Sequence, residues 1–161
     1  MQNHTNRFSW FDVTDDVKEL LILAAQNWEN TEESTKYMQQ ALAKTEDNTD
    51  VLVAAYRYFY YKNNYVLALT TAEKITARIK KAESLPENWQ ELTPILVNRH
   101  QEPEIRLYLT AYAASGLVLA KLGKIEQAKE ISTKIKSIDQ KNDFGAGILL
   151  DILTRPPEED D

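Results

Sequence analysis

The chain contains no cysteine, which excludes disulfides, zinc–thiolate sites and thiol nucleophiles. It has 2 histidines, His4 and His100, too few for a histidine-rich metal site, and its 4 glycines provide no glycine-rich phosphate-binding loop. Asp and Glu outnumber Lys and Arg by 25 to 19, and the resulting net charge of -6 argues against binding to a phosphate backbone. We therefore expect no cofactor, no metal and no nucleic-acid partner.

Long hydrophobic runs are also missing. The longest, residues 20–25, is far shorter than the roughly 20 residues that cross a bilayer, and residues 1–15 lack the apolar core of a signal peptide. We therefore expect a cytoplasmic protein without a membrane partner. The 161 residues, 43% of them hydrophobic, suffice for a single domain, 1–161, with a sizeable core.

No group of side chains combines a nucleophile with a base or a metal site, so we expect no enzymatic activity. Residues 46–50 match a calcium loop only in composition, because the glycine and the later glutamate of such loops are absent. Gly145 and Gly147 lie in a helical pattern with no preceding strand, which is not a dinucleotide site. Acidic pairs such as Glu32 and Glu33 are typical of a solvated helix surface.

Apolar residues recur at helical spacing, and no segment alternates with a period of two. The helical patterns run through residues 17–28, 37–42, 51–59, 68–79, 89–96, 108–122, 125–138 and 144–153. Start signals at Ser84 and at Pro103 predict a short helix that bends or ends near Pro94, and a long helix from Pro103 to Leu122. Turns are expected at 46–49, 63–64 and 123–124.

The helix pairs repeat along the sequence. A small residue begins the second helix of each pair: Ser34, Ala68 and Ala128. The first two are 34 residues apart and the last two are 60 apart, which is one more period plus an insertion of 26. The last pair also has an aromatic residue at Tyr112 and small residues at Gly116, Gly123 and Ala128. A plain helical bundle is the alternative, which equal spacing of matched small residues disfavours.

A 34-residue helix–turn–helix period with these residues resembles the tetratricopeptide repeat (TPR). The resemblance covers roughly two-thirds of the chain, and the closing proline of the family pattern is absent from every repeat. It implies an all-α, right-handed α-solenoid of helical hairpins ending in a capping helix. The expected parts are repeats at 15–48, 49–82 and 109–142, a helical insertion at 83–108, a capping helix at 143–154 and an acidic disordered tail at 155–161.

The resemblance also implies a concave groove, lined by the first helix of each repeat, that holds a peptide or helix of a partner protein. The groove residues that it implies are Leu23, Asn27, Arg57, Tyr60, Tyr61, Leu117 and Lys121. Arg and Tyr are favoured at binding hot spots, although the tyrosines could instead belong to the core. The Lys and Asn positions that clamp acidic chaperone tails in one TPR subclass hold Glu19, Leu23, Ala54, Thr110 and Ala114 here, so we do not expect that activity.

Two functions follow as expectations. The first is a protein–protein interaction module, acting as adaptor, assembly factor or chaperone. The alternative is a structural module that forms homo-oligomers through its insertion or its charged ends, because residues 1–50 carry a net charge of -6 and residues 121–142 one of +3. Simpler interpretations stay open: the charges can be solvated helix faces, and the insertion can fill a gap between repeats rather than form a lid or partner contact.

Overall fold

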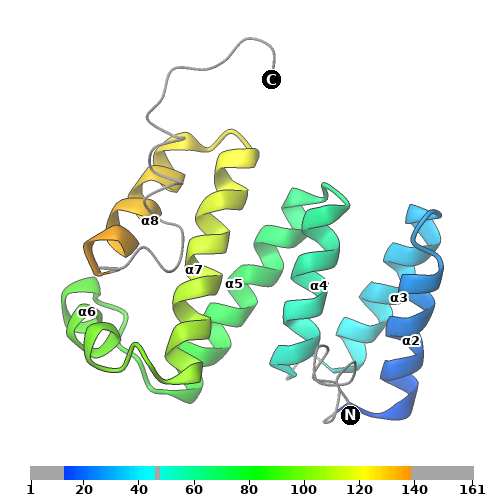
Figure 1. Cartoon of the computed structure of the whole chain (residues 1–161), viewed down its shortest axis with the longest axis horizontal. Helices are drawn as coiled ribbons and strands as arrows, with labels where there is room; N and C mark the ends of the chain where they lie inside the picture. The colour runs from blue at the N-terminus through cyan, green and yellow to red at the C-terminus, as the bar shows by residue number, and fades with distance from the viewer. Residues whose placement is uncertain (1–12, 46–47, 139–161) are drawn as a thin grey trace. The chain divides into compact units, whose positions relative to one another are not determined.

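The computed structural model describes residues 13–45 and 48–138. Over these ranges the chain forms α-helices and no strand, which confirms the all-α class for the described residues. The helices are α2 (Asp15–Gln26), α3 (Thr31–Lys44), α4 (Thr49–Tyr61), α5 (Tyr65–Ala82), α6 (Trp89–Asn98), α7 (Pro103–Lys121) and α8 (Ile125–Ile138) (Figure 1). His4, residues 46–47, Gly145 and Gly147, the predicted capping helix 143–154 and the predicted tail 155–161 lie outside the described residues.

The chain divides into two compact units, residues 1–71 (unit 1) and 72–161 (unit 2). Helix α5 begins in unit 1 and ends in unit 2.

In unit 1, asparagine side chains fix the starts of three helices, among them α5, where the Oδ1 of Asn64 accepts the backbone N–H of Leu67. The Oδ1 of Asn30 accepts the backbone N–H of Glu33 at the start of α3, and the Oδ1 of Asn48 accepts that of Val51 at the start of α4. Each bond satisfies an amide that the first turn of a helix leaves unpaired. The apolar stripes of α2, α3 and α4 face inward. The buried residues of these helices are Val17, Leu21, Ala24, Ser34, Met38, Ala41, Val51, Leu52, Ala55, Tyr58 and Phe59.

The three small residues on which the predicted repeat is based are fully buried. Ser34, Ala68 and Ala128 each have 0% of their surface exposed. Ser34 also donates its hydroxyl to the carbonyl oxygen of Ala24, at 2.6 Å, which joins α3 to α2. A small side chain at this position allows two helix backbones to approach closely, and a larger one would have no space in a close-packed interior.

Two turns between consecutive helices have the same geometry, sixty residues apart. Asn63 and Gly123 both have positive φ angles, 62° and 84°. The next residue in each turn donates its N–H back to the helix: Asn64 to the Phe59 carbonyl at 2.8 Å, and Lys124 to that of Leu119 at 2.9 Å. This is the Schellman arrangement that ends many helices. The predicted turns at 63–64 and 123–124 are therefore confirmed.

In unit 2, α7 packs against α8, and α6 contacts α8. Leu92 and Leu96 of α6 are buried, so the apolar face of the insertion is core. The predicted start of this helix at Ser84 is wrong. Ser84 ends α5 with a φ of 54°, Leu85 donates to the Lys80 carbonyl at 2.9 Å, and Asn88 caps α6 through the N–H of Glu91. Helix α6 also continues through Pro94 to Asn98.

Candidate partner-binding surface

The predicted groove residues fall in both units. Leu23 and Asn27 lie at the end of α2 and Arg57, Tyr60 and Tyr61 lie on α4, all in unit 1. Leu117 and Lys121 lie on α7 in unit 2, where Leu117 is half-buried and Lys121 is exposed.

The five residues of unit 1 differ in what their side chains can still bind. Asn27 donates its side-chain amide to the Leu23 carbonyl oxygen at 2.9 Å, so part of its hydrogen-bonding capacity is used within its own helix. Arg57, Tyr60 and Tyr61 are spaced at i, i+3 and i+4, which places them on one face of α4. Arg57 is exposed, and Tyr61 has 68% of its surface exposed. The strongest candidate surface is therefore on α4.

Tyr60 is the centre of a group of four tyrosines, which we call the tyrosine surface: Tyr56, Tyr60, Tyr61 and Tyr65. Its ring stacks on Tyr56 at a centroid distance of 6.0 Å and meets Tyr61 and Tyr65 edge-on at 5.5 and 5.8 Å. The Tyr65 hydroxyl donates to Asn63 Oδ1 at 2.9 Å, which ties the group to the turn after α4. These contacts fix the rings in place before any ligand arrives.

The phenol of Tyr56 is suited to hydrogen bonding rather than to proton abstraction. Burial raises the pKa of Tyr56 to about 12, with smaller contributions from Tyr60 and Tyr61. At neutral pH the Tyr56 hydroxyl is therefore protonated and is a poor general base. The surface offers flat apolar area, hydroxyl groups and the charge of Arg57, which is the chemistry of an interaction surface.

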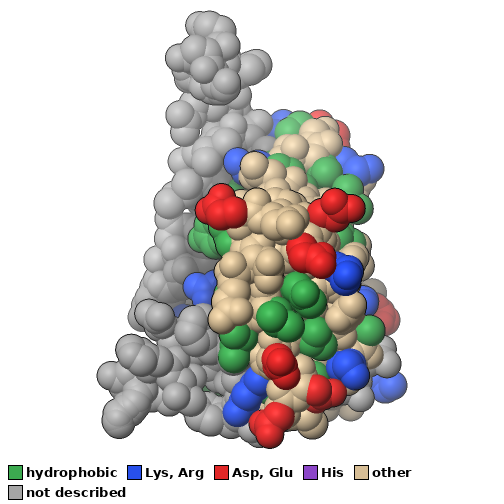
Figure 2. Space-filling view, turned by 90° about the vertical axis from the view of Figure 1, so that its right-hand side faces the viewer, with side chains coloured by type: hydrophobic (Ala, Val, Ile, Leu, Met, Phe, Trp, Pro, Cys, Tyr) green, Lys and Arg blue, Asp and Glu red, His purple; other side chains and the backbone are tan. Residues whose placement is uncertain are grey.

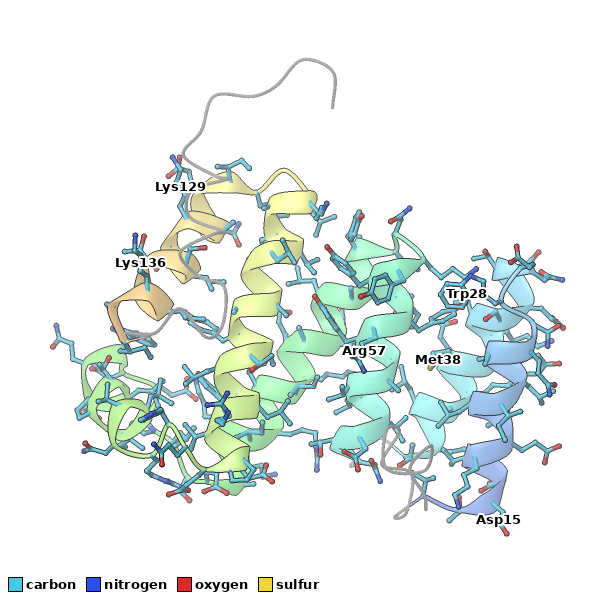
Figure 3. All side chains as sticks on the ribbon, in the orientation of Figure 1. Asp15, Trp28, Met38, Arg57, Lys129 and Lys136 are labelled. Carbon is cyan, nitrogen blue, oxygen red and sulfur yellow. The ribbon has the colours of Figure 1, made fainter. Side chains whose placement is uncertain are left out.

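Arg57 forms no ion pair with any other residue in the described part of the chain. Figure 3 shows its side chain on α4. An exposed guanidinium can donate to a ligand, and its planar fork fits a carboxylate.

A second feature of unit 1 was not predicted. Lys62 donates from Nζ to the backbone carbonyl of Trp28 and, at 3.2 Å, to Thr31 Oγ1, and its ammonium lies 4.0 Å from the centroid of the Trp28 ring. Trp28 also meets Tyr58 edge-on at 5.4 Å, so it joins the end of α2 to α4 (Figure 3). Trp28 and Lys62 are 34 residues apart, so the repeat period was the available signal for this contact.

In unit 2 the aromatic contacts hold the insertion in place. Trp89 of α6 lies 6.1 Å from Tyr112 of α7, and Lys134 of α8 lies 5.3 Å from the Trp89 ring. Tyr112 also stacks on Tyr108, and burial raises the pKa of Tyr112 to about 12. Trp89, Tyr108 and Tyr112 therefore contribute to packing within unit 2.

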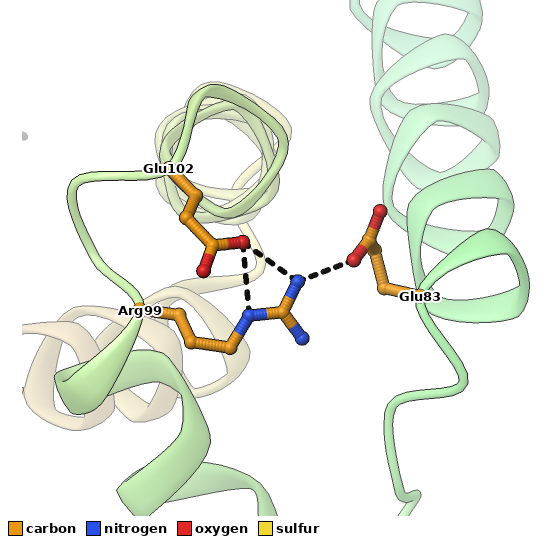
Figure 4. A network of polar contacts seen from close by, with 3 residues as sticks. All are labelled: Glu83, Arg99 and Glu102. Atoms are coloured by element: carbon orange, nitrogen blue, oxygen red, sulfur yellow. Dashed lines mark hydrogen bonds and ion pairs between the residues drawn. The ribbon is translucent and has the colours of Figure 1, made fainter.

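Arg99 also holds the insertion in place, through hydrogen bonds to Glu83 and Glu102 (Figure 4). Its Nε and Nη2 donate to Glu102 Oε1 at 3.0 and 2.7 Å, and Nη2 also donates to Glu83. Glu83 follows α5, Arg99 follows α6 and Glu102 precedes α7, so one guanidinium links the three segments. The hydrogen bond from Arg99 lowers the pKa of Glu102, and its two carboxylate partners raise the pKa of Arg99.

Two further faces carry charged side chains of both signs. Figure 2 shows the side of unit 1 formed by α2 and α3, where hydrophobic side chains lie among acidic and basic ones, and Ile22 of α2 is 44% exposed. On α8, Lys129 and Lys136 lie on the side away from α7 (Figure 3). A shallow depression of about 580 Å³ on α8 is lined by Glu126, Gln127, Lys129, Glu130, Thr133 and Lys134. Its two lysines and two glutamates balance, so it favours no ligand charge.

Within residues 13–45 and 48–138, no group of three or more His, Asp or Glu residues could hold a metal ion. Over the same ranges, no helix has the length and apolar character needed to span a membrane.

A known protein is related to the chain by sequence. The chain is 36% identical over 139 residues to an Azotobacter chroococcum mcd 1 protein described as an "Uncharacterized 19.8 kDa protein in nifW 5'region". The alignment covers 84% of this chain and 77% of that protein. The chain belongs to the family of that protein. Its description gives a gene position and no activity. No protein-family model matches the chain. No solved structure matches it either.

Proposed function

We propose that the chain is a TPR-like helical-repeat protein that binds a segment of another protein, as an adaptor, assembly factor or chaperone. It acts by passive capture on a preformed surface, without enzymatic chemistry, and in the cytoplasm. The observation that carries this proposal is that Arg57, exposed and without an ion pair among the described residues, lies on the same helix as Tyr56, Tyr60 and Tyr61 of the tyrosine surface.

The repeat interpretation is supported by the spacing of the helices. Helices α2 and α4 begin at residues 15 and 49, and α3 and α5 begin at 31 and 65, so both pairs of starts are 34 residues apart. The equivalent turns at Asn63 and Gly123 and the buried Ser34, Ala68 and Ala128 follow the same frame. Independent helices of a bundle have no reason to keep one period in starts, turns and packing positions together.

The choice of α4 as the binding element is supported by its composition. Tyr and Arg dominate binding hot spots because they combine large contact area with directed hydrogen bonds. Tyr61 presents 68% of its surface to solvent beside Tyr60, an arrangement that buries substantial apolar area only when a partner covers it.

Site-specific photo-crosslinking tests the proposal. A photo-reactive phenylalanine analogue at position 61 of the full chain, expressed in its native host, should cross-link to a discrete protein. The same analogue at Ile125, an exposed apolar position of unit 2, is the control. Arg57→Ala should weaken the cross-link from position 61, whereas Lys136→Ala, which removes an exposed lysine of α8, should not. Equal cross-linking from positions 61 and 125, or none from either, would contradict the proposal.

The self-assembly alternative stays a prediction with its own test. Charge reversal at Lys129 and Lys134 should then abolish oligomers while leaving the cross-link from position 61 intact. The buried Leu92 and Leu96 leave the apolar face of α6 occupied within unit 2, so the insertion offers little for such assembly.

A further inference from the structure

The tyrosine surface and Arg57 together define a ligand chemistry. An exposed guanidinium with no ion pair among the described residues is best satisfied by carboxylates. Flat, fixed aromatic rings are the usual docking area for proline, whose rigid ring loses little entropy on binding. The matching ligand is therefore an extended segment in which prolines adjoin acidic residues.

This chain contains such a segment, at residues 155–161: Arg-Pro-Pro-Glu-Glu-Asp-Asp. The two prolines favour an extended backbone and cannot continue a helix. The four acids that follow give the segment a strong negative charge, opposite to that of Arg57. Residues 139–154 lie between this segment and α8 in the sequence.

We propose that residues 155–161 of a second copy of the chain bind the tyrosine surface, with Pro156 and Pro157 against Tyr60 and Tyr61 and the acidic residues at Arg57. The inference rests on the proposed function, because it assigns a ligand to the same surface. It makes the contact heterologous: each copy offers one surface and one segment, so copies associate head to tail. A partner protein would then compete with this self-association.

Light scattering on the full chain over a range of concentrations and salt tests the inference. We expect the mass to rise with concentration and to fall at high salt, which screens the charges. Variant A carries Arg57→Glu, and variant B carries Glu158→Gln, Glu159→Gln, Asp160→Asn and Asp161→Asn. Each alone should associate about tenfold more weakly than the unmodified chain. Lys136→Glu, which reverses a charge on α8, should associate as the unmodified chain does.

Mixing the two variants distinguishes a second copy from other occupants. Variant A keeps an intact segment and variant B keeps an intact surface, so the mixture should form a one-to-one dimer at concentrations at which each variant alone is monomeric. A monomer under all conditions overturns the inference. So does a mixture that stays monomeric, which would mean that the segment binds within its own copy or not at all.

These experiments also distinguish a failure of this inference from a failure of the proposed function. Association that survives both variants but is lost on charge reversal of Lys129 and Lys134 overturns the inference in favour of the α8 lysines. A monomeric chain that still cross-links to another protein from position 61 overturns the inference alone. Failure of the proposed function leaves a different result: no foreign cross-link, whatever the oligomeric state.

Discussion

At the scale of single residues, Arg99 shows how one side chain can hold an insertion in place. Its guanidinium is shared between Glu102, two bonds at 3.0 and 2.7 Å, and Glu83, so the residues that flank α5, α6 and α7 meet at one cation. Exposed ion pairs contribute little individually. This one acts where chain segments must change direction, so we expect its loss to be felt locally, in the position of α6.

The first prediction concerns pH and Glu102. Arg99 lowers the pKa of this carboxyl in the folded chain. Its stabilising contribution is therefore fully present above the unfolded pKa, near 4.5, and is lost as pH falls through the lower folded value. In a Trp10→Phe, Trp28→Phe background, Trp89 fluorescence should change below about pH 4.5.

A matched pair of variants checks that prediction. Glu102→Gln should shift the Trp89 signal already at pH 6 and flatten its acid transition, because the amide cannot titrate. Glu91→Gln, an exposed glutamate of α6 in the same region, should leave the transition unchanged. An unaltered acid transition in Glu102→Gln would contradict the role of this ion pair.

At the scale of elements, close approach of paired helices depends on the small residue that begins the second helix. Ser34 is fully buried, and its hydroxyl reaches the Ala24 carbonyl of α2 at 2.6 Å. Alanine occupies the equivalent positions 68 and 128. Ser34→Ala should therefore cost about 1 kcal/mol for the lost hydrogen bond. Ser34→Leu should cost more, about 1–3 kcal/mol or above, by overpacking. Urea unfolding measures both, and equal losses would contradict close packing at this site.

The turns make a second prediction at this scale. Gly123 has a φ of 84°, and a β-carbon added there would have no atom within 4 Å. Gly123→Ala should therefore be destabilising by about 1 kcal/mol through backbone strain alone. Gly123→Asn should cost less, because asparagine tolerates this conformation and occupies it at Asn63. If the urea midpoint of Gly123→Asn is equal to or lower than that of Gly123→Ala, the positive φ does not determine which residue this turn accepts.

Sequence reasoning worked best where one residue type has one structural use. Small residues at Ser34, Ala68 and Ala128 are buried, and the turns at Asn63 and Gly123 form as expected. It failed at Ser84. A serine two residues before a proline is typical of a helix start, whereas in the folded chain Ser84 has a φ of 54° and follows the end of α5. Similarly, Pro94 is a helix breaker by its chemistry, yet α6 continues through it.

For the candidate surface, the sequence identified Arg57, Tyr60 and Tyr61, but not the arrangement around them. The stacking of Tyr56 on Tyr60 and the bond from Tyr65 to Asn63 depend on rotamers and on the turn geometry. The contact of Lys62 with Trp28 joins the end of α4 to the end of α2, and no local pattern indicates which lysine contacts which ring. Only the 34-residue period relates the two positions.

At the scale of the whole molecule, helix α5 decides how the two units depend on each other. It begins in unit 1 at Tyr65 and continues past the boundary at Thr71 and Ala72 into unit 2. A helix unfolds cooperatively along its length. We therefore expect the two units to unfold together rather than as independent domains.

Two single-tryptophan chains test this coupling. Trp10→Phe with Trp89→Phe leaves Trp28 as the reporter of unit 1, and Trp10→Phe with Trp28→Phe leaves Trp89 as that of unit 2. Ile135→Ala, at a fully buried position of α8, should cost unit 2 about 2–5 kcal/mol. If α5 couples the units, this substitution lowers the urea midpoint reported by Trp28 as well as that reported by Trp89. If the urea midpoint reported by Trp28 stays unchanged while that reported by Trp89 falls, the C-terminal part of α5 unfolds without its N-terminal part. The two units are then energetically independent.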